Sequence, residues 1–319
     1  MDLVLGVDVG GTSIKAGVFT TSGELLGETS VRTPELSSEA AYGLVTGSLK
    51  DLVASVDMPD PYVVAIGRDS PGPICEDGTI GLLANAVIDL DGVKGAIRSA
   101  FPGAFLTVVN DADAAAIGEM WQGAARDYRS FVCCTLGTGV GGGVVVGGNL
   151  VLGKNGSGGE IGHITVNPAE QDRCGCGRRG CLEQYASATG LVRLYLKECE
   201  ECGSQAWPIE HSSDAYGVFK ALDGGDEHAK SAISQMCEYL AIAFAQIATV
   251  VDPSAFVIGG GVAGSFDVFH DELVERFRAH CLPIQAGTPM IAATLGNQAG
   301  MFGSAYEALR GSKWRREDD

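Results

Sequence analysis

One histidine and three cysteines lie close together in the middle of the chain. His163, Cys174, Cys176 and Cys181 fall within nineteen positions, and the cysteines follow the spacing Cys-x-Cys-x4-Cys. The glycines between them permit the tight loop that converging thiolates need. Three thiolates and one imidazole form a closed, tetrahedral zinc site of the structural kind, with no position left for an activated water. The spacing therefore predicts zinc that orders this loop, and scattered free thiols are the alternative.

Glycine gathers in three turns that could hold phosphate, at Asp8–Thr12, Thr135–Gly143 and Gly259–Ala263. Backbone N–H groups in such turns can approach an anion without obstruction from a Cβ atom. The second turn has more glycine than a structural hairpin needs, which indicates a close ligand. It matches neither a Walker A loop nor a Rossmann fingerprint. The candidate phosphate and nucleotide contacts in the three turns are Gly10, Gly11, Thr12, Gly137, Thr138, Gly139, Gly260 and Gly261.

Carboxylates stand at the ends of two apolar runs. Asp8 could hold a magnesium ion, through water because Mg²⁺ keeps much of its hydration, and Lys15 either adds charge there or is solvated on its strand. Asp111 follows a buried run and precedes an alanine-rich helix, where a helix cap is the plain alternative. A carboxylate beside a phosphate site also suits the base that accepts a hydroxyl proton in a kinase.

Three further polar residues could accept hydrogen bonds from a polyhydroxy substrate. Glu160 and Glu183 flank the cysteine loop, and Asn85 is an isolated amide in an apolar loop. A metal in the cysteine loop would fix the geometry of the two glutamates.

Two halves of the chain repeat one order of elements, and each begins with strand, glycine turn and strand. Strands are expected at 3–10, 13–20, 25–33, 62–67, 104–109, 131–136, 140–146, 150–153, 255–258 and 290–295. Helices are expected at 40–56, 112–123, 181–202, 214–222, 226–250, 267–280 and 300–309. This order predicts two α/β domains with mixed sheets and a boundary near 121–130.

Composition excludes some classes of protein. The chain has 319 residues, with 22 Lys plus Arg against 40 Asp plus Glu, and its net charge of −18 disfavours nucleic acid as a partner. The apolar run Leu240–Val251 is too short for a membrane span, which needs about 20 residues. The N-terminus lacks the pattern of a signal peptide. We therefore expect a cytoplasmic protein with reduced cysteines and no membrane partner.

Together these motifs resemble the ROK family (repressors, open reading frames and sugar kinases), and in particular its bacterial glucokinases. The matching stretches occur in family order over nearly the whole chain, and the cysteine signature is the most specific of them. They are Gly6–Gly17, Ser70–Pro73, Asn110–Glu119, Thr135–Gly143, Glu160–His163, Cys174–Glu183 and Val257–Val262.

The resemblance implies an α/β fold of two actin-like (ribonuclease-H-like) domains with a cleft between them. The small domain would be 1–120, joined by the C-terminal helix 298–312, and the large domain would be 121–297 with the zinc loop. The implied activity transfers the γ-phosphoryl group of ATP to the 6-hydroxyl of a hexose, with glucose as the leading substrate and a place in glycolysis. ATP, Mg²⁺ and structural Zn²⁺ are the implied cofactors, and a homo-oligomer (dimer or tetramer) is the implied assembly.

The resemblance also implies roles for single residues. Asp111 would be the general base, the first glycine turn would hold phosphates, and the other two would hold phosphate and adenosine. His163 would serve both as a zinc ligand and as a sugar contact. The implied sugar contacts are Asn85, Asn110, Asp111, Glu160, His163 and Glu183.

Three departures from the family pattern bear on the substrate. Asp113 stands where relatives often carry Asn, the pair Arg68-Asp69 replaces small or apolar residues, and Ala86–Asp89 lacks the usual sugar-loop string. The last two are interpreted as touching the sugar loop.

The alternatives to a glucokinase are a kinase for N-acetylglucosamine, N-acetylmannosamine, fructose or allose, and a non-catalytic sugar-sensing regulator. Polyphosphate stays open as a donor. Family repressors carry an N-terminal helix-turn-helix, and the position of Asp8 argues against one here.

Overall fold

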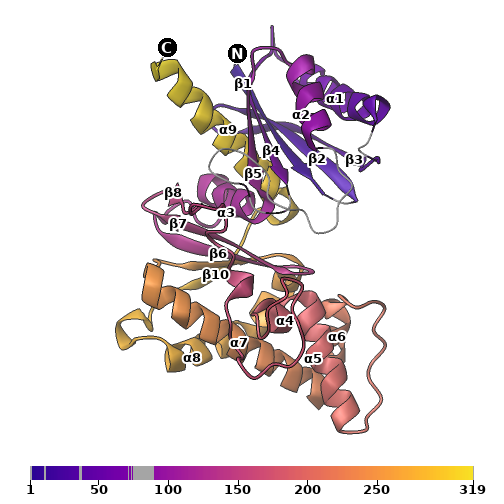
Figure 1. Cartoon of the computed structure of the whole chain (residues 1–319), viewed down its shortest axis with the longest axis vertical. Coiled ribbons are helices and arrows are strands. Elements are labelled where there is room, and N and C mark those ends of the chain that lie inside the picture. Colours follow the sequence, from indigo (N-terminus) through magenta and orange to yellow (C-terminus); the bar gives the residue numbers. More distant parts are fainter. Residues whose placement is uncertain are drawn as a thin grey trace. The chain divides into compact units, whose positions relative to one another are not determined.

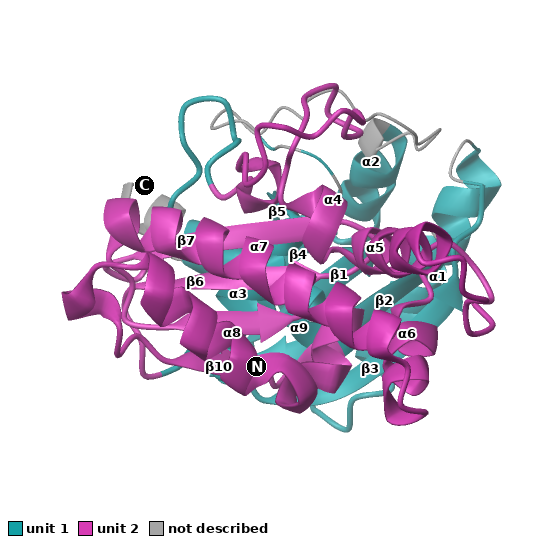
Figure 2. Ribbon diagram, turned by 90° about the horizontal axis from the view of Figure 1, so that it is seen from below, with its two compact units in different colours: residues 1–126, 150–158, 297–319 teal, residues 127–149, 159–296 magenta. Residues whose placement is uncertain are grey.

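The computed structural model describes residues 2–10, 12–35, 38–70, 72, 74 and 90–318 (Figure 1). The chain divides into two compact units, coloured separately in Figure 2. The first unit comprises Met1–Arg126, Leu150–Gly158 and Asn297–Asp319, and the second comprises Asp127–Asn149 and Gly159–Gly296. The segment Leu150–Gly158 thus lies in the first unit, whereas the sequence analysis placed it in the large domain. Leu150 packs there against the small apolar cluster that contains Val109 and Ile117.

The sheet of the first unit has the strand order β3-β2-β1-β4-β5. Its strands are β1 (Asp2–Val9), β2 (Ser13–Thr20), β3 (Leu25–Arg32), β4 (Tyr62–Ser70) and β5 (Phe105–Asn110). β1 to β3 form an antiparallel meander, and β1, β4 and β5 run parallel to one another. The carboxyl ends of these three parallel strands therefore meet at one edge of the sheet, which is where ligand-binding residues collect in open α/β sheets.

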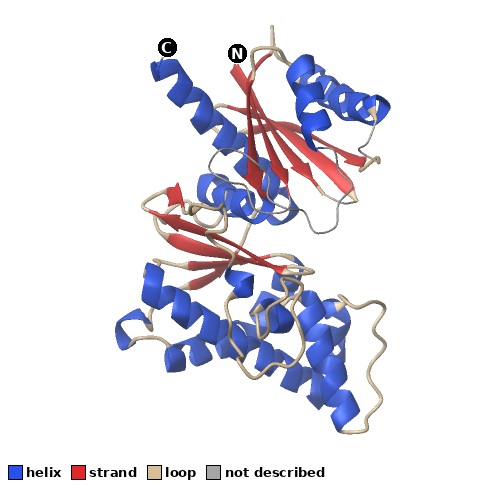
Figure 3. Ribbon diagram, in the orientation of Figure 1, coloured by secondary structure: helices blue, strands red, loops and turns tan. Residues whose placement is uncertain are grey.

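Helices cover both faces of this sheet (Figure 3). They are α1 (Glu39–Ala54), α2 (Leu90–Ala100), α3 (Asp111–Gln122) and α9 (Ala299–Asp318). Because side chains alternate along a strand, Leu3, Leu5 and Val7 of β1 face the core formed with α1 and α2. Gly6 and, on β4, Gly67 face α9. A Cβ atom on either glycine would overlap the α9 backbone, so glycine lets the helix lie directly on the sheet.

The second unit is a five-stranded sheet of order β10-β9-β6-β7-β8, packed against a group of helices. Its strands are β6 (Phe131–Leu136), β7 (Val140–Val146), β8 (Asn149–Leu150), β9 (Phe256–Gly259) and β10 (Met290–Ala292). Its helices are α4 (Glu183–Ala186), α5 (Ala188–Glu201), α6 (Ala215–Asp223), α7 (Glu227–Val251) and α8 (Phe266–His280). Short 3₁₀ turns lie at Ile161–His163, Gly261–Ser265, Pro283–Gln285 and Gly296–Gln298. Cys133 and Cys134 are buried in β6.

Helix α7 is the centre of the second unit's core. By length and composition it could cross a membrane, but 56% of its most apolar window is buried inside the protein. Its apolar side chains, among them Met236, Leu240 and Phe244, pack against the other helices and the sheet. Among the described residues it is the sole helix that passes this test of length and composition.

Several elements differ from the prediction, and the following differences bear on the site or the topology. β4 continues to Ser70, so that Arg68 and Asp69 belong to the strand. α2 was not predicted, because Gly92 and Gly95 lower its helix propensity. The helix expected over 181–202 is two helices, since Ser187 ends α4 and caps α5. α9 continues beyond Leu309 to Asp318.

Candidate functional site

Three aspartates stand at the carboxyl edge of the first unit's sheet. Asp8 is the penultimate residue of β1, Asp69 is the penultimate residue of β4, and Asp111 follows β5 as the first residue of α3. The register carries them to the same level, because Val7 pairs with Arg68 and Asp69 pairs with Val109. Oδ1 of Asp69 also accepts a hydrogen bond of 2.8 Å from the backbone N–H of Val9.

The three carboxylates influence one another's ionisation. Burial raises the pKa of Asp8 and of Asp111, and it raises the pKa of Asp69 well above its usual value. The negative charge of Asp111 adds to the rise at Asp8 and Asp69, and that of Asp8 adds to the rise at Asp69. Lys15 opposes the rise at Asp8, with its Nζ 4.0 Å from Oδ2 of Asp8 and 3.3 Å from the carbonyl oxygen of Asn297. This edge is therefore poor in positive charge and suited to a cation.

Asp111 remains accessible at the start of α3 although the protein around it displaces water. Its Oδ1 accepts the N–H of Ala112 at 2.8 Å. The helix cap is the neighbouring Asn110, whose Oδ1 accepts from the N–H groups of Ala112 and Asp113. Nδ2 of Asn110 donates to the carbonyl of Gly72 at 2.9 Å. The Asp111 carboxylate keeps lone pairs that could accept hydrogen bonds from a ligand.

The first glycine turn uses part of its backbone internally. The N–H of Gly10 donates to the carbonyl of Ser13 at 3.1 Å, and the hydroxyl of Thr33 donates to the carbonyl of Gly10 at 2.6 Å. The carbonyl of Thr12 accepts the N–H of Thr33 at 3.0 Å, and the Thr12 side chain is exposed. Gly11 and Asn85 lie outside the described residues.

The other two glycine turns lie side by side in the second unit. Gly260 has φ of +86°, and a Cβ atom there would lie 2.5 Å from the carbonyl oxygen of Leu136, at the end of β6. Only glycine tolerates both this positive φ and the lack of space for a Cβ atom. In the turn after β6, the N–H of Gly137 donates to Gly139 and its carbonyl accepts from Ala188, the first residue of α5. Gly261 begins a 3₁₀ turn that leads into α8.

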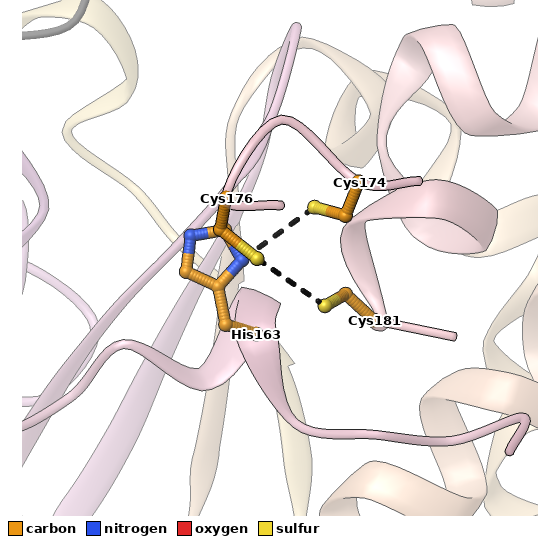
Figure 4. A group of neighbouring side chains, drawn as sticks. All are labelled: His163, Cys174, Cys176 and Cys181. Carbon is orange, nitrogen blue, oxygen red and sulfur yellow. Dashed lines mark hydrogen bonds between the residues drawn. The ribbon is translucent and has the colours of Figure 1, made fainter. Parts of the chain in front are cut away.

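His163, Cys174, Cys176 and Cys181 form one cluster in the second unit (Figure 4). Their ligand atoms all lie within 4.8 Å of one another. Sγ of Cys176 is 3.7 Å from Sγ of Cys181, and Sγ of Cys174 is 3.8 Å from Nδ1 of His163. A zinc tetrahedron with Zn–S bonds of about 2.3 Å has edges of about 3.8 Å. The donor set and its spacing therefore fit a tetrahedral metal ion.

Burial raises the pKa of the Cys174 thiol to about 12 and also raises that of Cys181. Burial acts in the same direction on Cys176, but the N–H of Arg178 and the other two thiols lower the pKa of Cys176 overall. A metal must displace the protons of these thiols, so its affinity depends on pH.

Two glutamates flank the cluster. Oε2 of Glu160 lies 4.0 Å from Nε2 of His163, the ring nitrogen that faces away from the thiols, and the Glu160 side chain is otherwise exposed. Oε2 of Glu183 accepts the N–H of Val140 at 3.1 Å, and its Oε1 lies 3.6 Å from Sγ of Cys174. Glu183 thus joins the metal loop to the second glycine turn.

A cavity of about 410 Å³ lies in the second unit where these parts meet. It is lined by Thr138 and Gly139 of the second glycine turn, Cys174 of the cysteine loop, Glu183, and Arg193 of α5. The hollow therefore offers a charged wall and a backbone turn to one small ligand.

The family profile of the ROK family matches residues 4–310. The chain belongs to the ROK family. A glucokinase from Halalkalibacterium halodurans is 36% identical over 317 residues, with 95% of this chain and 93% of the relative covered. An N-acetyl-D-glucosamine kinase from Salmonella paratyphi A is 32% identical, with 94% and 97% covered. A ROK glucokinase from Streptomyces griseus, solved with glucose and AMPPNP, has a TM-score of 0.77 and 31% identity, with 97% of this chain and 100% of that chain covered.

The predicted fold class is confirmed, because this ROK protein has the actin-like (ribonuclease-H-like) fold with two mixed sheets. Arg68 and Asp69, which were interpreted as touching the sugar loop, belong to strand β4. Both are buried, and Oδ1 of Asp69 accepts a hydrogen bond from the N–H of Val9 at the end of β1. Residues 75–89 lie outside the described residues, so contact with that loop stays a prediction. The signal that singled out Asp111, an acidic residue at the end of an apolar parallel strand, could also have found Asp69.

Proposed function

We propose that this ROK protein is an ATP-dependent hexose kinase that phosphorylates the 6-hydroxyl of its sugar, with glucose as the leading substrate. The observation that carries the proposal is the accessible carboxylate of Asp111, placed beside Asp8 and the first glycine turn in one unit. The kinase names of relatives that cover nearly the whole chain support it.

Asp111 is the proposed general base. It would accept the proton of the sugar hydroxyl as that oxygen attacks the γ-phosphorus in line, and the bond to the leaving β-phosphate oxygen would break. Burial raises the pKa of Asp111, which makes the carboxylate a stronger proton acceptor than a solvated aspartate. The hydrogen bond from Ala112 holds one carboxylate oxygen, so the other oxygen would receive the proton.

ATP and Mg²⁺ would bind at the glycine turns and at Asp8. Magnesium supplies charge neutralisation between the phosphate oxygens when it is bound. Asp8 would hold it, and Lys15 would add positive charge toward the phosphates. The proposed nucleotide contacts are Gly10, Gly11, Thr12, Gly137, Thr138, Gly139, Gly260 and Gly261.

Zinc is the proposed occupant of the His163, Cys174, Cys176 and Cys181 cluster, because three thiolates and an imidazole favour it over harder cations. Bound zinc supplies a rigid cross-link for the loop. Glu160 and Glu183, which lie beside the ligands, would then be held in place for sugar hydroxyls. Asn110 and Asn85 remain proposed sugar contacts by resemblance.

A kinase for N-acetylglucosamine is the second candidate. The relative from Salmonella paratyphi A carries that name and covers as much of the chain as the glucokinase does. The proposed setting is cytoplasmic, in glycolysis, with a homo-oligomer as the assembly and without nucleic acid or membrane as partners. The net charge of −18 supports the exclusion of nucleic acid.

The test is a matrix of sugars and phosphoryl donors on the purified protein. The sugars are glucose, N-acetylglucosamine, N-acetylmannosamine, fructose and allose, and the donors are ATP and polyphosphate, with product sugar phosphate measured by mass spectrometry. The highest kcat/KM with glucose and ATP is expected. A higher kcat/KM with N-acetylglucosamine would favour the second candidate function. If no pair of sugar and donor gave product, the kinase proposal would fail and a sugar-sensing regulator would be favoured.

A further inference from the structure

Asp69 is a buried carboxylate whose second oxygen has no partner. The residue is 1% exposed, and Oδ1 is satisfied by the N–H of Val9, but Oδ2 accepts no hydrogen bond. An unpaired charged oxygen away from water costs free energy, so a native structure that keeps one calls for an explanation.

Backbone of α9 and the acidic side chain of Asp8 lie close to Oδ2. Gly300, in the first turn of α9, lies so near that a Cβ atom on it would overlap Oδ2, and the same atom would lie 3.4 Å from Cγ of Asp8. Oδ2 of Asp69 and the side chain of Asp8 therefore border the same space beside Gly300. The charges of Asp8 and Asp111 both act unfavourably on ionised Asp69, while Arg68 acts favourably without a hydrogen bond to Oδ2.

A divalent cation would account for the unpaired Oδ2, for the nearness of the Asp8 side chain and for the unfavourable charges of Asp8 and Asp111. Mg²⁺ prefers carboxylate oxygens and water, and it would neutralise the mutual repulsion of Asp8 and Asp69. A purely structural role for Asp69 explains its Oδ1, which holds Val9, but it leaves Oδ2 without a function. If the carboxylate had no such role, asparagine at position 69 would give a more stable protein, because it keeps the hydrogen bond from Val9 without a buried charge.

We propose that Asp69 is a further ligand, directly or through water, of the divalent cation at the first glycine turn, sharing it with Asp8. This inference rests on the proposed kinase function for the identity of the cation as Mg²⁺. It assigns the departure from the family pattern at Asp69 to phosphate and cation binding, and removes it from sugar recognition.

The test measures Mn²⁺, a paramagnetic substitute for Mg²⁺, binding to the purified protein in the absence of nucleotide and sugar, by electron paramagnetic resonance of the free ion. Asp69→Asn is expected to weaken Mn²⁺ binding by about tenfold or more. The matched control is Glu307→Gln, which removes a half-buried acidic side chain of the first unit, one that pairs with Arg310. This control is expected to bind Mn²⁺ as the wild type does.

A second measurement guards against a variant that merely unfolds. Without metal, Asp69→Asn is expected to melt at the same temperature as the wild type or higher, because a buried charge is lost and the bond to Val9 is kept. Added Mn²⁺ should raise the melting temperature of the wild type and not that of Asp69→Asn. Equal Mn²⁺ affinity of the two proteins, or a lower metal-free melting temperature with an unchanged Mn²⁺ response, would overturn the inference. Both readouts are independent of turnover, so a failure of the kinase proposal in the sugar matrix is recognised separately.

Discussion

At the scale of the residue, the chemistry assigned to the ROK protein depends on one accessible carboxylate. Asp111 lies outside the core, yet burial around it raises its pKa, and the N–H of Ala112 donates a hydrogen bond to its Oδ1. The adjacent Asn110 performs the capping that the sequence also allowed for Asp111. A residue relieved of a structural duty in this way is free to exchange protons with a substrate.

Replacing Asp111 with asparagine should remove the base and little else. Asp111→Asn is expected to lower kcat by about 10²–10⁴-fold while the Kd for the sugar, measured by calorimetry, stays close to that of the wild type. The control is Asp113→Asn, which converts a buried aspartate in the same helix to the residue that relatives often carry. Turnover of Asp111→Asn near that of Asp113→Asn would take the base role away from Asp111.

The metal cluster makes a second prediction for a single residue. Cys176→Ser is expected to lose zinc, because a serine hydroxyl does not replace a thiolate ligand, and sugar binding should weaken as Glu160 and Glu183 lose their support. Zinc per chain is measured by elemental mass spectrometry. Cys202→Ser is the matched control, since Cys176 and Cys202 are both exposed and Cys202 is outside the cluster. Zinc-free wild-type protein, or full zinc retention in Cys176→Ser, would contradict the assignment.

Residue types and spacing were sufficient to predict which side chains would gather around the cysteine loop, since a short loop limits where its ligands can lie. They were insufficient for Asp69, because the pattern ended its strand at Gly67 and assigned the residue to a loop. Nor could spacing indicate that Glu183 bonds to the N–H of Val140, a contact between segments far apart in the sequence.

At the scale of the element, α9 shows how glycine positions the first unit. The helix rests on β1 and β4 at Gly6 and Gly67, where its own backbone occupies the space of a Cβ atom. The same helix carries Gly300 to the carboxylates of Asp8 and Asp69. A displacement of α9 would therefore move the surroundings of Asp8 and Asp69 as well as the core.

Adding one methyl group beneath α9 should be costly. Gly67→Ala is expected to destabilise the protein by about 1–3 kcal/mol in urea unfolding, because the new Cβ atom must push the backbone of Ser304 away. Gly43→Ala, in the exposed part of α1 where no atom lies within 4 Å of the added Cβ, should instead stabilise by about 0.5–1 kcal/mol. A Gly67→Ala variant as stable as Gly43→Ala would show that α9 tolerates the shift.

Element types were largely predictable because the periodicity of buried residues differs between strand and helix. The strands β1, β2 and β6 have the predicted character, and so does the long helix α7. Helix α2 escaped prediction because its glycines weaken the local signal and its packing on α1 supplies the stability instead. At the division between α4 and α5, the N–H of Ala188 also donates to the carbonyl of Gly137, a tertiary contact that spacing does not reveal.

At the scale of the whole molecule, the two units have separate cores and differ in how they hold their acidic groups. In the first unit, Asp69 is buried and Glu307 is half-buried, and removal from water raises the pKa of both although Arg68 and Arg310 lower them. In the second unit, Glu170 is buried enough to oppose ionisation, but the Tyr185 hydroxyl and the Arg193 guanidinium lower its pKa to about 2. The net charge of the chain could not reveal that carboxyl pKa values are raised in one unit and lowered in the other.

The metal-free protein should therefore respond to acid in opposite ways in its two units. A carboxyl group with a raised pKa binds more protons folded than unfolded, so the penalty on the first unit is present at pH 7 and declines as the pH falls through the folded pKa toward about 4. A group with a lowered pKa, such as Glu170, stabilises above its unfolded pKa of about 4.5, and that contribution is lost as the pH falls toward 2. Hydrogen–deuterium exchange in EDTA, corrected for the intrinsic rate, should show β4 more protected at pH 5 than at pH 7, and α7 less protected at pH 3 than at pH 5. Asp69→Asn should reduce the change in β4 protection between pH 7 and pH 5, and Glu170→Gln should reduce the change in α7 protection between pH 5 and pH 3. If both units responded to pH in the same direction in the wild type and in both variants, these two groups would not set the pH dependence.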